Sequence, residues 1–401
     1  MAESGPVLAI DIGGTKMAAG VTEPGGRLIT WAQIPTLRDI DGEQLWRNLE
    51  DLLLGVLEDA KVTDPAELSG IGCGCGGPME WPAGRVSPLN IPAWRHFPLR
   101  ERLAARFGTG GGPVRVHNDA ICMAAGEHWR GAGRGWRNVL GMVVSTGVGG
   151  GLILDDHLIA GSSGNAGHIG HVVVYPDGPA CACGGRGCLE AIARGPALTE
   201  WAQSHGWRPD QPGMTAKDLS ADAAQGHGVA IEAMRHAGRA LGIAIASATS
   251  LCDLEVVAIG GGLSQAGSLL FGPLQETLAV HARLDFTRQV RVVPAALGQS
   301  AGLVGAAALI AAGERYWTGD LTSAACLPLS SLRPCRAAPA AAGRRPASRY
   351  RPGRTMPAPR RQTRIRARAR RICAGRRPTD RLRARRTGRV SASRSSSPSS
   401  R

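Results

Sequence analysis

Long hydrophobic runs are missing from the sequence, which argues against a membrane protein. No uninterrupted apolar stretch reaches the length needed to span a bilayer. Residues 1–6 contain no basic segment of the kind that opens a signal peptide, so export is not expected. The ten cysteines are irregularly scattered apart from one cluster, which favours metal binding over a disulfide framework. We therefore expect a protein of the cytoplasm with no membrane partner.

Lysine is absent from residues 314–401, which contain 24 Arg and only three acidic residues. Residues 1–313 contain 23 basic and 29 acidic residues, so the net charge of +15 arises in the tail. Few large apolar residues accompany the Arg, Ala, Pro and Ser of the tail, which predicts disorder. Such a tail supports at most non-specific, salt-sensitive nucleic-acid binding. We expect truncation after Gly313 to leave the fold intact.

Strand-like and helix-like segments alternate along the rest of the chain. Residues 7–11 are a short apolar run before a Gly-Gly turn, and residues 43–57 have apolar side chains at helical spacing. Further strands are expected at 17–22, 27–33, 68–75, 114–117, 139–144, 255–259 and 290–294, and further helices at 120–130, 229–250 and 300–312. This order predicts an α/β protein of two lobes with a cleft between them. The lobes are expected at 1–120, closed by helix 300–312, and at 121–299.

Three glycine-rich segments each follow an expected strand, as phosphate-binding loops do. They are Asp-Ile-Gly-Gly-Thr-Lys at 11–16, Ser-Thr-Gly-Val-Gly-Gly-Gly at 145–151 and Gly-Gly-Gly at 260–262. Glycine lets the backbone approach a phosphate, and the Asp11 carboxylate suits a magnesium ion held through water. One such turn is common, whereas three of them predict a nucleotide site. The expected phosphate- or ATP-binding residues are Asp11, Gly13, Gly14, Thr15, Lys16, Ser145, Thr146, Gly147, Gly149, Gly261 and Gly262.

Residues 117–120 read His-Asn-Asp-Ala at the junction of an expected strand and helix. By itself this pattern indicates a helix N-cap, with Asn118 or Asp119 bonded to the first turn. Beside a phosphate site, a carboxylate also suits a phosphoryl transferase, which must orient and deprotonate a hydroxyl group. Both roles are compatible if Asn118 caps the helix and Asp119 faces the cleft.

A cysteine cluster, Cys181-Ala-Cys-Gly-Gly-Arg-Gly-Cys188, has a histidine ten residues upstream at position 171. The three cysteines lie close enough in sequence to bind one ion, and His171 would complete a closed Cys3His set with Cys181, Cys183 and Cys188. Such a set is typical of structural zinc. The alternative is a reduced cysteine cluster in a surface loop. Cys73 and Cys75 lack a matching second pair and lie in a strand-like run, so we expect them to pack in the core.

In their order along the chain, these motifs resemble the ROK family (repressor, open reading frame, kinase) over about residues 5–312. The resemblance includes Gly-Asn-Ala-Gly-His-Ile-Gly-His at 164–171 and Leu-Glu at 189–190. It implies an actin-like, ribonuclease-H-like two-lobed fold, ATP as the donor, magnesium as its partner ion and a homodimer. It also implies that Asp119 is the catalytic base acting on the 6-hydroxyl of a sugar. The sugar ligands that it implies are Asn118, His171 and Glu190, with Asn90 as a further candidate.

Position 168 departs from most sugar kinases of the family. Glucokinases usually carry Glu in a Gly-Glu-x-Gly-His run, where this chain has His168. A carboxylate accepts hydrogen bonds from two sugar hydroxyls, whereas a neutral imidazole offers one donor and one acceptor. The run 166–171, with Asp-Gly-Pro at 177–179, is similar to bacterial N-acetylmannosamine kinases. We therefore expect N-acetylmannosamine as the substrate, with glucose or N-acetylglucosamine next.

The family also contains transcriptional repressors, which carry a winged helix-turn-helix before the first phosphate loop. That loop begins at Asp11 here, which leaves no room for such a domain, so we expect an enzyme. An inactive sugar sensor with structural zinc would lack Asp119, which is present. The identity of the sugar, and polyphosphate as an alternative donor, stay open at this point.

Overall fold

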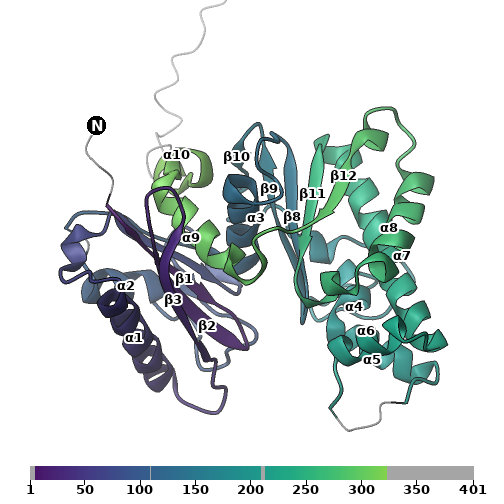
Figure 1. Ribbon diagram of the computed structural model, residues 1–401, viewed down its shortest axis with the longest axis horizontal. Coiled ribbons are helices and arrows are strands. Elements are labelled where there is room, and N and C mark those ends of the chain that lie inside the picture. The colour runs from purple at the N-terminus through teal and green to yellow at the C-terminus, as the bar shows by residue number, and fades with distance from the viewer. Residues whose placement is uncertain (1–4, 109, 209–212, 323–401) are drawn as a thin grey trace, which may run out of the picture. The chain divides into compact units, whose positions relative to one another are not determined.

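The computed structural model describes residues 5–108, 110–208 and 213–322, within the first of the two units into which the chain divides, residues 1–332. They form two five-stranded sheets and a two-stranded ribbon with helices around them, which confirms the predicted α/β class (Figure 1). Strands of the first sheet fall within residues 7–118 and those of the second within 139–294. None of the helices in the described ranges is long and apolar enough to cross a membrane.

The first sheet combines an antiparallel meander with parallel strands. Its order is β3 (Leu28–Pro35), β2 (Lys16–Thr22), β1 (Val7–Ile12), β4 (Gly70–Cys75) and β7 (Val114–Asn118). β1 pairs antiparallel with β2 and parallel with β4, and β4 pairs parallel with β7. All five strands were expected from the apolar pattern. The carboxyl ends of β1, β4 and β7 consequently meet at one edge of the sheet, where ligands bind in open α/β sheets.

Helix α1 (Gly42–Asp59) covers one face of this sheet. It begins at Asp41, whose side chain accepts a hydrogen bond from Gln44 N at 2.7 Å. Its apolar residues recur every three or four positions and form one buried stripe, which consists of Leu45, Trp46, Leu49, Leu52, Leu53, Val56 and Leu57. The ribbon β5 (Met79–Glu80) and β6 (Arg85–Val86) and helix α2 (Leu99–Arg106) connect β4 to β7.

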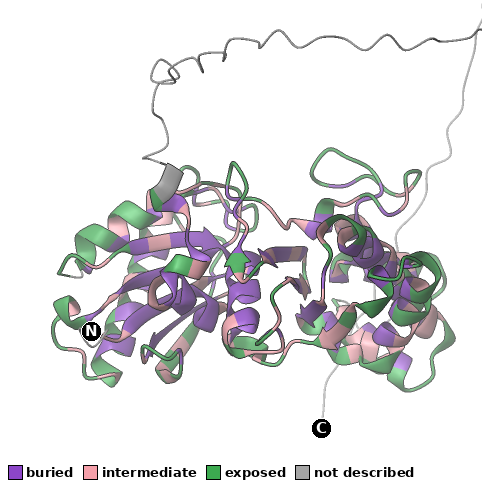
Figure 2. Cartoon of the chain, turned by 90° about the horizontal axis from the view of Figure 1, so that it is seen from above, coloured by how far each residue is buried: buried purple, intermediate pink, exposed green. Residues whose placement is uncertain are grey.

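The second sheet repeats the pairing pattern of the first. Its order is β10 (His157–Leu158), β9 (Val148–Leu154), β8 (Val139–Val144), β11 (Val256–Gly260) and β12 (Arg291–Pro294). β8 pairs antiparallel with β9 and parallel with β11, which pairs parallel with β12. The inner strands are buried and the exposed residues concentrate on helices and loops (Figure 2).

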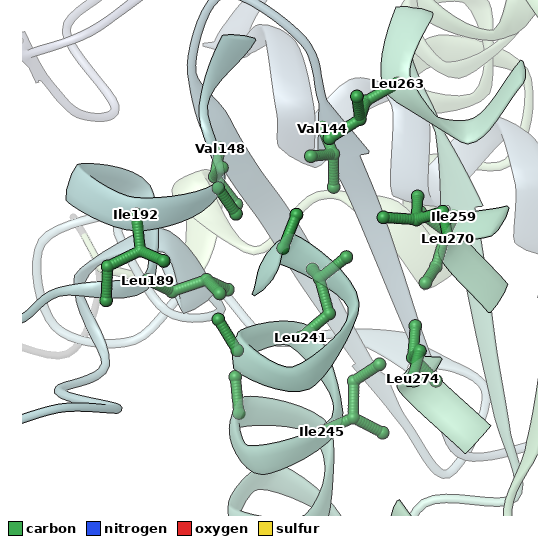
Figure 3. Packing of buried hydrophobic residues seen from close by; sticks show 14 of the residues in the cluster. Val144, Val148, Leu189, Ile192, Leu241, Ile245, Ile259, Leu263, Leu270 and Leu274 are labelled. Carbon is green, nitrogen blue, oxygen red and sulfur yellow. The ribbon is translucent and has the colours of Figure 1, made fainter. Parts of the chain in front are cut away.

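Helices α7 (Gly228–Cys252) and α8 (Ser268–His281) pack together against this second sheet. Figure 3 shows Leu241 and Ile245 of α7 beside Leu274 of α8, with Val144 of β8 above them. The smaller helices of the same part are α4 (Leu189–Ala193), α5 (Gly195–Ser204) and α6 (Ala216–Ala224). Because α4 shares this core through Leu189 and Ile192, the residues around it have a rigid support.

Helices α3 (Asp119–Arg130) and α9 (Ala301–Ala311) pack on each other between the two sheets (Figure 1). α3 also contacts β8 and β9, and α9 contacts β1 and β4. The two helices approach closely because glycine faces the partner backbone: a Cβ added at Gly305 would overlap the Cys122 carbonyl group. The two sheets are thus joined through a helix pair with little room for larger side chains.

The predicted start of the disordered tail at residue 314 is wrong. The chain continues as α10 (Gly313–Tyr316) and α11 (Gly319–Thr322). Tyr316 is 0% exposed and its hydroxyl group lies 2.8 Å from His128 Nδ1, while Trp317 is 7% exposed. These two aromatic residues were overlooked because the composition of the segment is dominated by the arginines that follow. The rest of the predicted tail, 323–401, lies outside the described residues.

Candidate active site

The first predicted phosphate loop forms the tight turn between β1 and β2. Gly13 N donates a hydrogen bond to Lys16 O at 2.9 Å, and Thr36 Oγ1 donates to Gly13 O at 2.8 Å. A Cβ added at Gly14 would overlap the side chain of Asn90, so this predicted sugar ligand lies directly against the loop. The turn therefore has the short, glycine-dependent geometry expected of a phosphate loop.

Asp11 and Asp119 come close together because β1, β4 and β7 run parallel in adjacent positions. Burial raises the pKa of Asp11 to about 7, the Asp119 carboxylate adds to this rise and Lys16 opposes it. Burial also raises the pKa of Asp119. Two neighbouring carboxylates in a partly desolvated place favour a cation between or beside them. This part of the site is therefore suited to a metal-bound phosphate group.

Asn118 is the N-cap of α3, as predicted. Its Oδ1 accepts a hydrogen bond from Ala120 N at 3.0 Å, and Asp119 Oδ1 accepts from the same N–H at 2.9 Å. The cap places Asp119 in the first helical turn, at the carboxyl end of β7. The same residue pair thus ends a strand, begins a helix and fixes where the carboxylate lies.

The second glycine segment, 145–151, was predicted to be one continuous loop, but the structure divides it into a turn and a strand. Only residues 145–147 form the turn, and Val148–Leu154 is strand β9, with Gly149 paired to Val143 and Gly151 to Gly141. A Cβ added at Gly149 would lie 2.7 Å from Ala120 Cβ. Gly149 and Gly151 therefore allow α3 to pack closely on the sheet, a role that a sequence pattern does not distinguish from phosphate binding.

The turn 145–147 lies beside the third glycine segment, at the ends of β8 and β11. Gly261 has φ = 90°, and a Cβ there would overlap the carbonyl group of Val144. A Cβ at Gly262 would lie 3.8 Å from Ser145 Oγ. The predicted residues Ser145, Gly261 and Gly262 are therefore neighbours in space, because parallel pairing of β8 and β11 aligns the two turns.

His168, a predicted sugar ligand, lies near Asp119, and two further predicted ligands, His171 and Glu190, lie near His168. Glu190 Oε2 accepts a hydrogen bond from Val148 N at 2.9 Å, which anchors the carboxylate to the second turn. His168 interacts electrostatically with both Asp119 and Glu190, and its ring stacks 6.3 Å from that of His171. His168 Nδ1 is buried and makes no hydrogen bond of good geometry within the described residues, although the imidazole also interacts with the backbone of Asn165. A polar atom in that position is available for a ligand.

Two further residues at this place were not predicted, Trp81 and His117. Their rings are 5.7 Å apart, and Trp81 also packs against Gly164 at the start of the segment that carries His168. His117 Nδ1 accepts from Asn118 N at 2.9 Å, while burial, helped by His168, lowers the pKa of His117 to about 3. His117 is thus a neutral, buried wall of the site. Its position one residue before Asn118 was the only signal in the sequence.

The cysteine cluster brings four potential metal ligands close together. The ligand atoms of His171, Cys181, Cys183 and Cys188 all lie within 4.8 Å of one another. Cys181 Sγ lies 3.9 Å from His171 Nδ1, and Cys183 Sγ lies 3.7 Å from Cys188 Sγ. Bonds of zinc to sulfur and nitrogen place such atoms about 3.5–3.8 Å apart in a tetrahedron. The four predicted side chains therefore converge and fit one ion.

The chain is similar to sugar kinases over most of its length. A family model described as "ROK family" matches residues 7–312. The chain is 33% identical to the glucokinase of Thermotoga maritima over 317 residues, which cover 76% of this chain and 96% of the relative. It is 34% identical to the N-acetylmannosamine kinase of Yersinia pseudotuberculosis over 303 residues, which cover 76% and 97%.

A solved structure, the ROK family glucokinase of Streptomyces griseus in complex with glucose and AMPPNP, matches with a TM-score of 0.65 and 33% identity. The match covers 76% of this chain and 99% of the glucokinase. Together with the sheet order, it confirms the predicted actin-like, ribonuclease-H-like fold class.

Proposed function

The chain belongs to the ROK family, and from this membership we propose that it is an ATP-dependent sugar kinase that phosphorylates the 6-hydroxyl of a hexose or N-acetylhexosamine. The observation that carries the proposal is the pair Asp11, on β1, and Asp119, directly after β7, at the carboxyl ends of two parallel strands that flank β4, with the glycine turn 13–15 beside Asp11. Phosphoryl transfer needs little more than a positioned base and electrostatic stabilisation of the phosphate.

In this proposal each residue has one task. Asp119 accepts the proton of the sugar hydroxyl, because burial raises the pKa of its carboxyl group and so makes the carboxylate a stronger base. Asp11 would hold the magnesium ion of the nucleotide through water, and that ion would neutralise charge on the phosphates. The proposed sugar ligands are Asn90, Asn118, His168, His171 and Glu190. As the N-cap of α3, Asn118 also fixes the direction of Asp119.

A screen for sugar-dependent ADP release tests the proposal. The full chain is mixed with Mg·ATP and each of a set of hexoses and N-acetylhexosamines, and ADP is followed by a coupled assay. We expect phosphorylation of at least one of them, with a kcat/KM of about 10⁴ M⁻¹s⁻¹ or more for the preferred sugar. The proposal would be contradicted if the wild type released ADP no faster than the Asp119→Asn variant with every sugar tested.

Within this class we propose N-acetylmannosamine as the preferred sugar. The support is His168, a neutral imidazole near Asp119 and Glu190 whose buried Nδ1 makes no hydrogen bond of good geometry within the described residues. Similarity alone does not favour it over glucose, since the relatives named glucokinase and N-acetylmannosamine kinase are 33% and 34% identical. The choice therefore depends on the chemistry of position 168.

Replacing His168 with Glu should shift the preference toward glucose. A carboxylate accepts hydrogen bonds from two adjacent hydroxyls, so we expect the ratio of kcat/KM for glucose to that for N-acetylmannosamine to rise by about tenfold or more. The matched control is His157→Glu, a change at an exposed histidine of β10. An unchanged ratio in the His168 variant would place sugar specificity elsewhere.

We also propose that the Cys3His cluster binds structural zinc. Its loop connects the two halves of the sugar site, because His171 ends the segment that carries His168 and Cys188 directly precedes α4 with Glu190. Val173 and Cys188 form a β-bridge between these halves. A metal held by these four side chains would fix the segment with His168 relative to α4 with Glu190. The homodimer that the family resemblance implies stays a prediction.

Loss of one ligand should release the metal. In Cys183→Ser we expect the zinc content to fall from about one ion per chain to near zero, with a lower Tm and a higher KM for the sugar. The measurement is elemental analysis of protein purified without chelators, together with sugar kinetics. Cys252→Ser, at a partly buried cysteine outside the cluster, is the control. Wild-type protein free of zinc would contradict the proposal.

A further inference from the structure

Glu127, in the last turns of α3, is an acidic residue that is 0% exposed. Its Oε2 accepts hydrogen bonds from Ala132 N at 2.8 Å and from Ala296 N at 3.0 Å. Its Oε1 accepts from Leu297 N at 2.8 Å. Both oxygens are thus bonded to backbone N–H groups, which replace the hydrogen bonds to water that a buried carboxylate loses. No part of this network was among the predicted site residues.

The two segments that Glu127 joins are far apart in sequence and both connect the sheets. Ala132 lies on the way from α3 to β8, and residues 296–297 lie on the way from β12 to α9. The approach is tight, because a Cβ added at Gly131 would overlap Glu127 Oε2. We call these two connecting segments the first and the second crossing. The Glu127 carboxylate therefore bonds both crossings to the end of α3.

The second crossing leads directly to the phosphate side of the site. Gln299 Oε1 accepts a hydrogen bond from Lys16 Nζ at 2.9 Å. Three residues further on, a Cβ at Gly302 would overlap the carboxylate of Asp11, so the start of α9 presses on that side chain. The segment that contacts Lys16 and Asp11 is thus itself bonded to Glu127. Two consecutive backbone N–H groups of this segment, those of Ala296 and Leu297, donate hydrogen bonds to the Glu127 carboxylate.

We propose that Glu127 is a positioning residue for nucleotide binding: it fixes the crossing 295–302 so that Gln299 and Gly302 hold Lys16 and Asp11 in place. The inference rests on the proposed function for the role of the phosphate loop. Glu127 itself does not touch the predicted ligands, and it acts through the backbone of Ala296 and Leu297. It is buried and polar, so an apolar or amide replacement leaves N–H groups without an acceptor.

The test is Glu127→Gln in the full chain, with Mg·AMPPNP binding measured by calorimetry in the absence of sugar. The amide keeps one oxygen but presents N–H groups where the carboxylate accepted bonds, so we expect nucleotide Kd to rise about tenfold. The KM for the sugar should change by less than about twofold, because Asn118 lies at the opposite end of α3 from Glu127 and the other proposed sugar ligands lie on other segments. Gln299→Ala, an exposed substitution that should fold, is expected to weaken nucleotide binding in the same direction.

Glu255→Gln is the matched control, because Glu255 Oε2 also accepts two backbone N–H bonds, from Arg137 and Asn138, both at 2.8 Å. It should lower Tm without changing the Kd for Mg·AMPPNP. Equal nucleotide affinity in wild type, Glu127→Gln and Gln299→Ala would overturn the inference. Failure of wild-type protein to bind Mg·AMPPNP would instead overturn the proposed function, and this inference with it.

Discussion

We expect turnover to fall by about 10²-fold or more when Asp119 is replaced by Asn, while sugar and nucleotide still bind. The amide has the shape of the carboxylate and can still accept the hydrogen bond from Ala120 N that Asp119 Oδ1 accepts at 2.9 Å. It has no basic oxygen that could take the proton of the sugar hydroxyl. The kcat is measured by coupled ADP release, and the sugar Kd by calorimetry.

The pH profile provides a second readout of the same residue. Burial raises the pKa of Asp119, so the base becomes protonated and inactive as the pH falls through that raised value. The kcat/KM of the wild type should therefore decline on the acid side, and Asp119→Asn should lack the part of this decline that comes from residue 119 and keep the part that comes from Asp11. Asp285→Asn, at a carboxylate whose side chain is 97% exposed, is the control. Near-normal turnover of the Asp119 variant would remove this residue from the mechanism.

We expect truncation after Gly313 to destabilise the protein strongly, in contrast to what the composition of the tail predicts. It removes Tyr316, which is fully buried against His128, and Trp317, whose ring lies 5.7 Å from Trp81 and 6.1 Å from His117. Loss of a large buried aromatic side chain costs about 3–5 kcal/mol of the free energy of unfolding. We therefore expect a much lower Tm and urea midpoint, or no folded protein.

A chain that ends at Thr322 is the control for this truncation. It keeps α10, α11 and the ion pair between Arg115 and Asp320 at 2.9 Å, and we expect its Tm to equal that of the full chain. The shorter chain, where it folds, should also have a raised sugar KM, because Trp81 packs on Gly164 of the sugar-binding segment. Identical Tm values for the chains ending at 313 and 322 would show that α10 and α11 do not contribute to stability.

Much of the site was predictable because its signals are local. A strand that ends in Asp-x-Gly-Gly, a strand that ends in Asn-Asp and a loop with three cysteines each carry their meaning in fewer than ten residues. The helix cap at Asn118 and the convergence of His171 with Cys181, Cys183 and Cys188 followed those signals. Such features depend on backbone geometry and on residue chemistry at short range.

Other features could not be predicted because they depend on which segments become neighbours. Gly149 looked like part of a phosphate loop, yet α3 lies against it, and only the packing of that helix explains the glycine. Trp317 falls in the tail that was predicted to be disordered, yet its ring packs against the rings of Trp81 and His117. In both cases the decisive contact joins residues far apart in the chain.

The sequence by itself determined the main strands of the two sheets except β9, the helices α1, α3, α7 and α9, the α/β class, the family and the residue types of the site. It did so because periodic burial and turn chemistry act over a few residues. The tertiary structure alone decided that Asp11 meets Asp119, that Glu127 anchors the crossing to α9 and that the fold includes Tyr316 and Trp317. Strand order and helix packing place those groups together, and their free energy comes from contacts between distant segments.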